Sequence, residues 1–309
     1  MSSGVTIAVV GGPLAHELGK KGTASDLTLY HAVRDEHAAT LVEPSQFPER
    51  FPPLLAALAM ADRCLLVVPE LSRPVAETIA TVELADVPTT IVRGAAVGQS
   101  ELARALKGGR LETAEQRPLD LPALRALVES WSAPIVDGPV VVPIDHAFPV
   151  KGVGAVALGV VRRGVLHAHD KLRLWPGPKS VEVRSIQVHD IDRRDASSGE
   201  RVGVALRGVE ADELSRGQVL APDGSLREGA ALVGGAFARC RYYRGDAGLG
   251  AQVNLAVGLQ SVPGTIDELS AAASRVSSDR PVVHAPGTRV YVMDLSVPLG
   301  PRLVGAFAL

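Results

Sequence analysis

The sequence predicts an α/β domain followed by two small β-barrels. Over residues 1–135, short apolar runs alternate with segments of helical periodicity. This alternation is typical of a mostly parallel sheet covered by helices on both faces. From residue 138 onward, short runs of Val, Ile and Leu alternate with Gly, Asp and Pro. That pattern is typical of compact barrels of short strands. The predicted domains therefore span residues 1–135, 138–222 and 228–309.

Each element of the first domain follows from a local pattern. Apolar runs predict strands at 5–10, 64–68 and 89–92, and a hairpin is predicted over 27–41. Helices are predicted at 14–20, 51–61, 74–84, 100–106 and 122–131. Asp120 is the expected cap of the last helix, because its side chain can accept a hydrogen bond from the first turn.

The later domains are predicted from strands and turns alone. Gly164 separates two apolar runs, as a hairpin turn would. In the third domain, strands are predicted at 232–241, 251–257, 288–295 and 301–309. Residues 265–277 are rich in Ala, and we expect a helical turn or a polar loop there.

Several motifs in one order identify the middle of the chain. DHAFPVKGVGAVALGVVRRGVLHAHDKL begins at residue 145 and is followed by RSIQVHD, GERVGVALRGV and LSRGQVL. Linked motifs over about 80 residues are far more specific than any one of them. They resemble the second domain of translational GTPases, above all elongation factor Tu and the selenocysteine-specific factor SelB. The resemblance implies a G-type α/β domain followed by two barrels like those of elongation factor Tu.

The resemblance also implies where a nucleotide would bind, but the phosphate loop is degenerate. Such a loop needs Gly-x4-Gly-Lys-Ser/Thr, because its N–H groups wrap the phosphates and its hydroxyl binds Mg²⁺. Counted from Gly12, the second glycine position holds Glu17. The pair Gly19-Lys20 comes two residues too late, and Lys21 stands where the hydroxyl is needed.

Two further signatures fail in the same domain. Where these GTPases carry Asp-x-Pro-Gly-His, the chain reads Glu43-Pro-Ser-Gln-Phe47. The glycine that senses the γ-phosphate and the water-positioning histidine are thus both replaced. The guanine-reading Asn-Lys-x-Asp is replaced by Arg93-Gly-Ala-Ala96. We therefore expect that GTP and Mg²⁺ do not bind, that the chain has no cofactor and no catalytic residue, and that it is not an enzyme.

Two other interpretations of this region stay open. An unusual loop could still bind nucleotide, and its candidate residues are Gly11, Gly12, Lys20, Lys21 and Thr23. The polar segment 19–26 could instead bind a phosphate or an RNA backbone, or be a solvated loop. The candidate phosphate or RNA residues in that segment are Gly19, Lys20, Lys21 and Thr23.

The third domain contains the densest basic and aromatic run, residues 239–245. Arg pairs with phosphate, and Tyr stacks on bases. In elongation factor Tu this domain contacts tRNA, so the resemblance implies a candidate RNA surface formed by Arg239, Arg241, Tyr242 and Arg244. The alternative is a strand whose arginines simply face solvent.

Composition excludes several classes of protein. The net charge of −2 gives no global basic field, and DNA is not expected as a partner. Cys64 and Cys240 cannot build a disulfide framework or a zinc site, and no metal site is expected. No apolar run is long enough to span a bilayer, which favours a cytoplasmic protein without a membrane partner.

These observations predict a GTPase-deficient paralogue of elongation factor Tu or SelB. It would bind tRNA, the ribosome or another translation factor without hydrolysis. The first alternative is a divergent GTP-binding elongation factor with an atypical phosphate loop. The second is a scaffold within a protein complex, without RNA.

Overall fold

The computed structural model of the chain describes residues 3–34, 37–297 and 300–309. The chain forms two compact units. The first unit contains residues 1–132, 237–248 and 291–306, and the second contains 133–236, 249–290 and 307–309. The third predicted domain therefore contributes segments to both units.

The first domain is built on one seven-stranded sheet in the order β2-β3-β4-β1-β5-β6-β7. Its strands are β1 (Ser3–Val10), β2 (Lys20–Ala24), β3 (Thr28–Arg34), β4 (His37–Glu43), β5 (Arg63–Val68), β6 (Thr89–Arg93) and β7 (Glu115–Pro118). From β4 through β7 neighbouring strands are parallel, whereas β2, β3 and β4 are antiparallel.

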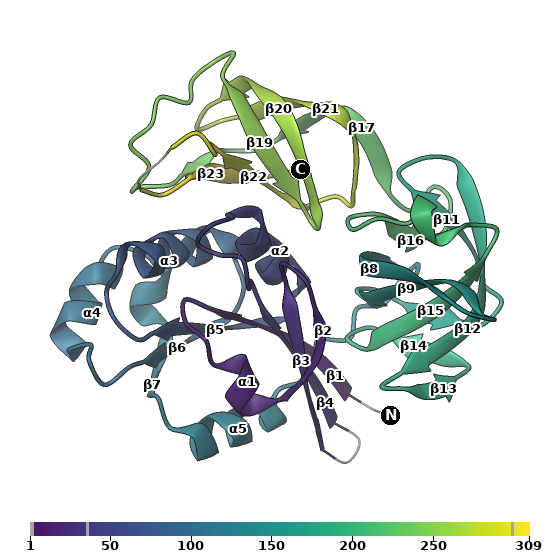
Figure 1. Cartoon of the computed structure of the whole chain (residues 1–309). Helices are drawn as coiled ribbons and strands as arrows, with labels where there is room; N and C mark the ends of the chain where they lie inside the picture. The colour runs from purple at the N-terminus through teal and green to yellow at the C-terminus, as the bar shows by residue number, and fades with distance from the viewer. Residues whose placement is uncertain (1–2, 35–36, 298–299) are drawn as a thin grey trace. The chain divides into compact units, whose positions relative to one another are not determined.

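Helices cover both faces of this sheet (Figure 1). They are α1 (Ala15–Leu18), α2 (Pro52–Met60), α3 (Arg73–Ala85), α4 (Gln99–Leu106), the 3₁₀ turn η1 (Arg110–Thr113) and α5 (Leu121–Ser130). Alternate residues of β1, such as Val5 and Ile7, pack against α1 and α5. The Asp120 side chain accepts a hydrogen bond from Ala123 N at 3.2 Å, so the predicted cap is confirmed.

The second domain contains a closed barrel. Its main sheet has the order β11-β16-β8-β9-β15-β12-β13, and β11 also pairs with β12, which closes a ring of six strands. The strands are β8 (Val142–Val150), β9 (Gly154–Val160), β11 (Lys171–Trp175), β12 (Lys179–Val188), β13 (Ile191–Arg193), β15 (Arg201–Arg207) and β16 (Val219–Ala221). A short 3₁₀ turn, η2 (Ala211–Glu213), precedes β16.

One turn prediction in this barrel is wrong. The strand after Gly164, β10 (Val165–His167), pairs with β14 (Asp195–Ser197) and not with β9, so no β9–β10 hairpin forms. Gly164 still needs to be glycine. Its φ is +69°, and an added Cβ would lie 2.3 Å from Gly138 O.

The third domain contains another seven-stranded sheet, in the order β17-β21-β20-β19-β22-β23-β18. Its strands are β17 (Arg227–Gly234), β18 (Ala238–Arg239), β19 (Gln252–Val257), β20 (Gln260–Leu269), β21 (Ser274–His284), β22 (Arg289–Met293) and β23 (Leu303–Ala308). The helical turn or polar loop expected at 265–277 is wrong. Ile266 and Val276 pair across β20 and β21 and are both buried, so burial of apolar side chains selects a hairpin.

Candidate functional site

The loop that follows β1 is where the resemblance places a nucleotide. Gly11 has φ +91°, and a Cβ added there would lie 2.3 Å from Val67 O. Gly12 lies against Val67 and Pro69, at the end of β5. These glycines let the backbone approach β5 closely before it turns into α1. The loop is therefore a tight connection held against the neighbouring strand.

Glu43, the last residue of β4, binds the start of α1. Its Oε1 atom accepts hydrogen bonds from Leu14 N at 2.8 Å and from Ala15 N at 2.7 Å. The first N–H groups of a helix have no partner within the helix, and they favour anions. A carboxylate from the chain itself thus occupies the N–H groups of the degenerate loop.

Tyr30 on β3 belongs to the same cluster. Burial raises the pKa of Tyr30, and the negative charge of Glu43 and its hydrogen bond with the phenol raise it further. The carboxylate has this effect because a neighbouring negative charge opposes the formation of phenolate. Glu43 therefore connects the degenerate loop to β3.

The candidate phosphate or RNA residues lie in a strand and at its entry. The helix predicted at 14–20 ends at Leu18, and β2 begins at Lys20, so that prediction is too long. An added Cβ on Gly19 would lie 3.0 Å from both Leu41 and His31, so the backbone packs tightly where the chain enters β2.

The loop expected at 19–26 is for the most part a strand, because β2 spans Lys20–Ala24. Lys20 pairs with His31 and Lys21 with Tyr30, in an antiparallel ladder at the sheet edge, and Thr23 lies in the same strand. Successive residues of a strand point to opposite faces. A phosphate loop instead gathers its groups around one anion. Binding of phosphate or RNA by Gly19, Lys20, Lys21 and Thr23 remains a prediction.

The positions of the second and third signatures make contacts within the chain. The Phe47 and Phe51 rings lie 6.4 Å apart, and the Arg302 guanidinium stacks over both at 5.8 and 5.0 Å. After β6, Arg93 Nη1 donates to Val97 O at 2.7 Å, which closes a turn. Gly94 packs so tightly on Pro69 that an added Cβ would lie 2.8 Å from Pro69 Cα.

The predicted RNA surface meets the end of α4. Arg241 Nη1 donates to Lys107 O at 2.7 Å, and the Tyr242 hydroxyl donates to Ala105 O at 3.2 Å. A cation at a helix C-terminus is favourable, because the last carbonyl groups carry partial negative charge. Arg241 and Tyr242 are thus engaged by the first domain.

The other two residues of that surface contact their own segment. Arg244 Nη1 donates to Arg241 O at 2.8 Å, and the Arg239 guanidinium stacks over Tyr243 at 5.6 Å. Both side chains are otherwise exposed. RNA binding by the four residues remains a prediction, and Arg239 and Arg244 are the exposed members of the set that take no part in the hydrogen bonds with the end of α4 described above.

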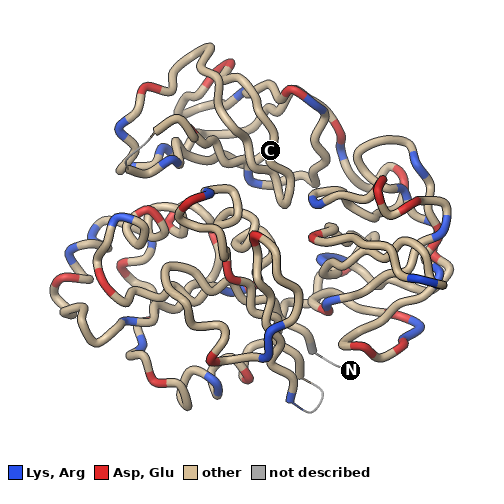
Figure 2. Tube along the Cα trace, in the orientation of Figure 1, with Lys and Arg blue, Asp and Glu red and all other residues tan. Residues whose placement is uncertain are grey.

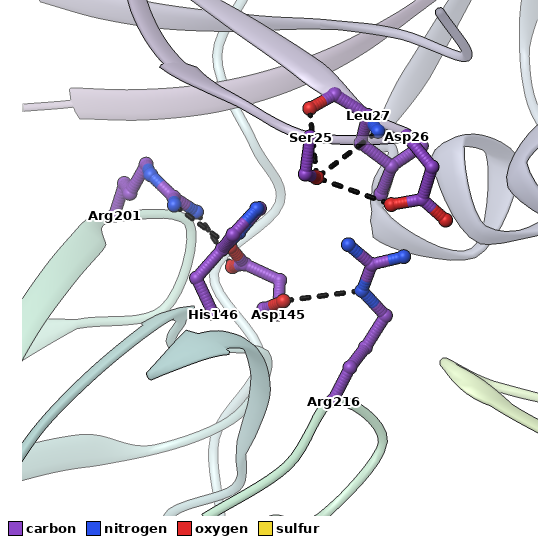
Figure 3. Close-up of polar contacts among 7 residues, drawn as sticks. All are labelled: Ser25, Asp26, Leu27, Asp145, His146, Arg201 and Arg216. Atoms are coloured by element: carbon purple, nitrogen blue, oxygen red, sulfur yellow. Dashed lines mark hydrogen bonds and ion pairs between the residues drawn. The ribbon is translucent and has the colours of Figure 1, made fainter. Parts of the chain in front are cut away.

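A buried polar cluster in the barrel of the second domain was missed by the sequence patterns. Arg201 pairs with both carboxylate oxygens of Asp145, at 2.7 and 2.8 Å, and Asp145 is only 1% exposed. His146 Nδ1 lies 2.6 Å from the same carboxylate, and Arg216 Nε donates to Asp145 O at 3.1 Å (Figure 3). The available signal was a charged residue, Arg201, at the head of an apolar strand.

A second close contact visible in Figure 3 belongs to the first unit. The Ser25 hydroxyl bonds Asp26 and Leu27 O, which ties the β2–β3 turn. Basic and acidic residues are interspersed along the trace of each unit (Figure 2).

Within the described ranges, no cluster of three or more His, Cys, Asp or Glu residues could hold a metal ion. No helix found among the described residues has the length and apolar character needed to cross a bilayer.

Residues 154–221 match the sequence family of elongation factor Tu domain 2. An uncharacterized protein of Methanocaldococcus jannaschii is 31% identical over 310 residues, which cover 98% of both chains. The selenocysteine-specific elongation factor of that organism is 30% identical over 228 residues, which cover 66% of this chain but 49% of that protein.

A solved structure confirms the predicted fold class. Translation elongation factor SelB from Methanococcus maripaludis, in complex with the GTP analogue GppNHp, matches 99% of this chain with a TM-score of 0.82 and 19% identity. The match covers 78% of the SelB chain. The chain therefore belongs to the elongation factor Tu and SelB family of translation factors, as a paralogue of its translational GTPases.

Proposed function

We propose that this chain acts in translation without binding or hydrolysing GTP. The contact between Glu43 and the start of α1 carries the proposal. An oxygen of this carboxylate already accepts the hydrogen bonds of Leu14 N and Ala15 N. A nucleotide phosphate could bind those N–H groups only after displacing the Glu43 carboxylate, because two anions repel each other at close range.

The expected penalty for that displacement supports the proposal. Hydrogen bonds to a charged group contribute about 1.5–3 kcal/mol each. Losing two of them would weaken phosphate binding by about 3–6 kcal/mol, or roughly a hundredfold to ten-thousandfold. The chain offers little in return, because Lys21 stands at the metal-binding hydroxyl position and Ala96 at the guanine-reading carboxylate position.

Isothermal titration calorimetry with GTP and Mg²⁺ tests the proposal, with an elongation factor Tu as the positive control. We expect no heat of binding up to millimolar GTP, and no phosphate release during a long incubation. A micromolar dissociation constant for GTP would overturn the proposal. It would favour the divergent GTP-binding factor instead.

The proposed partner is tRNA, the ribosome or another translation factor. The relationship to the elongation factor Tu and SelB family supports this class of partner. Fluorescence anisotropy with labelled tRNA at increasing salt tests the RNA arm. Arg239→Ala and Arg244→Ala should weaken binding and flatten its salt dependence, because each removes one exposed cation. Equal affinity of the variants and the wild type would remove these residues from the proposed surface.

A further inference from the structure

A buried ion pair joins α3 to the segment before β23. Glu77 on α3 is only 6% exposed. Its Oε1 accepts from Arg302 N at 2.7 Å and from Arg302 Nε at 3.0 Å, and its Oε2 accepts from Arg302 Nη2 at 2.6 Å. A bidentate pair with an added backbone bond is a strong and directional contact. It holds together two residues that are 225 positions apart in the sequence.

Two aromatic rings also lie close to the Arg302 guanidinium. Phe51 lies 5.0 Å and Phe47 5.8 Å from the Arg302 guanidinium carbon. Such stacking contributes more to stability when the cation is shielded from water. Arg302 is thus held by a carboxylate from α3 and by the rings that precede α2.

Two helix ends add weaker anchors to the same docking. Arg241 and Tyr242 bind the last carbonyls of α4, as described above. The Tyr291 hydroxyl donates to Ala85 O, at the end of α3, at 3.4 Å. All these contacts lie within the first unit and connect residues 237–248 and 291–306 to the α/β domain.

We propose that Glu77 and Arg302 form a permanent latch, which keeps residues 237–248 and 291–306 docked on α2, α3 and α4 without any nucleotide. The independence from nucleotide rests on the proposed function above. In a GTP-driven switch, contacts with the γ-phosphate order loops and change how domains dock. Here the docking contacts are made by side chains of the chain itself, so the docked state is the resting and working state.

The two cysteines provide an internal readout of the latch. Cys240 lies in the docked segment and is 4% exposed, and its N–H donates to Val304 O at 2.9 Å. Burial raises the pKa of the Cys240 thiol, although backbone hydrogen bonds of Tyr242 and Tyr243 and the charge of Arg241 oppose that rise. The Glu77 charge makes a smaller contribution that also raises it. Cys64 in β5 is fully buried, and burial raises its pKa to about 12. Because Glu77 on α3 lies close enough to Cys240 to act on its thiol, we expect opening of the latch to expose Cys240 alone, whereas global unfolding should expose both thiols.

The experiment measures the labelling rate of each cysteine in the full chain with a thiol reagent, read by peptide mass spectrometry. Arg302→Ala should speed labelling of Cys240 by about tenfold or more, because an unpaired buried Glu77 opposes docking. Cys64 should stay protected. Arg280→Ala is the matched control, since Arg280 is an exposed arginine on β21 in the other unit. Adding GTP and Mg²⁺ to the wild type should not change the Cys240 rate.

Arg302→Lys is the second variant, because it keeps the charge but loses the bidentate fork. If Arg302→Ala labels both cysteines together, it has unfolded, and the lysine variant decides. Cys240 labelling at the wild-type rate in Arg302→Lys would then overturn the latch. A change in the wild-type Cys240 rate with GTP would overturn its independence from nucleotide. GTP binding by calorimetry without such a change would refute the proposed function and leave the latch intact.

Discussion

Glu43→Gln is the substitution that most directly tests how the degenerate loop is held. The glutamine keeps the size of the side chain and one carbonyl oxygen, but it removes the charge. In the wild type, Glu43 Oε1 accepts hydrogen bonds from Leu14 N at 2.8 Å and from Ala15 N at 2.7 Å. Bonds to a charged acceptor contribute about 1.5–3 kcal/mol each, against about 1 kcal/mol for neutral ones. We therefore expect a loss of about 2 kcal/mol from the free energy of unfolding, or about 4–8 °C in Tm.

Urea unfolding and calorimetry measure this loss, and Glu49→Gln is the control. Glu49 is an exposed glutamate six residues further along the chain, and its replacement should change stability little. NMR of labelled tyrosines adds a local readout. Because the Glu43 charge helps to raise the pKa of Tyr30, the phenol should titrate at lower pH in Glu43→Gln. Unchanged stability together with an unchanged Tyr30 titration would refute the role assigned to Glu43.

Three further predictions concern the barrels and the α4 contact. Asp145→Ala should lower the free energy of unfolding of the barrel of the second domain by about 3–5 kcal/mol in urea, because it leaves Arg201 buried without its partner. Burial alone would raise the pKa of Asp145, but the charge and hydrogen bonds of Arg201 outweigh it and hold that pKa below its ordinary value. The stability from the pair should therefore be complete above the unfolded pKa of about 3.9 and be lost as pH falls through the lower folded pKa, which an acid titration by circular dichroism can follow. Gly164→Ala should destabilise by about 1–3 kcal/mol in thermal unfolding, because φ is +69° and Gly138 O leaves no room for a Cβ. Arg241→Ala should speed hydrogen exchange at the end of α4, which would stay unchanged if Arg241 did not bind Lys107 O.

Much of the fold could be predicted, because its elements carry strong periodic signals. The apolar runs of β1, β5 and β6 and the amphipathic patterns of α3 and α5 are local properties of the sequence. The fold class also followed from the resemblance over the second domain. These signals need no information about distant contacts.

The predictions that failed depend on distant contacts. Lys20 and Lys21 are polar and look like a loop, yet they form an edge strand because β3 offers a free ladder beside them. The Ala-rich stretch after Thr265 looked helical or irregular. It becomes a hairpin because Ile266 and Val276 meet in the core. Tertiary burial overrides local propensity in such segments.

The contacts within the candidate site could not be predicted from local sequence patterns either. The sequence predicted that three nucleotide signatures are broken, but it did not predict what the replacing residues do. Whether a carboxylate at Glu43 reaches the N–H groups of α1 depends on the packing of β4 beside β1. The pairing of Glu77 with Arg302 joins positions 225 apart, and no local pattern encodes it.

The residues at two of these positions make contacts of their own. Glu43 caps α1, and Phe47 stacks on the same arginine that pairs with Glu77. A residue without such contacts could be replaced at little cost to stability. Here, we expect reversion of Phe47 to His to weaken the packing around Arg302 without creating a nucleotide site, because Glu43 would still occupy the N–H groups of Leu14 and Ala15. Under the proposed function, GTP binding by this chain would therefore need coordinated changes at several positions.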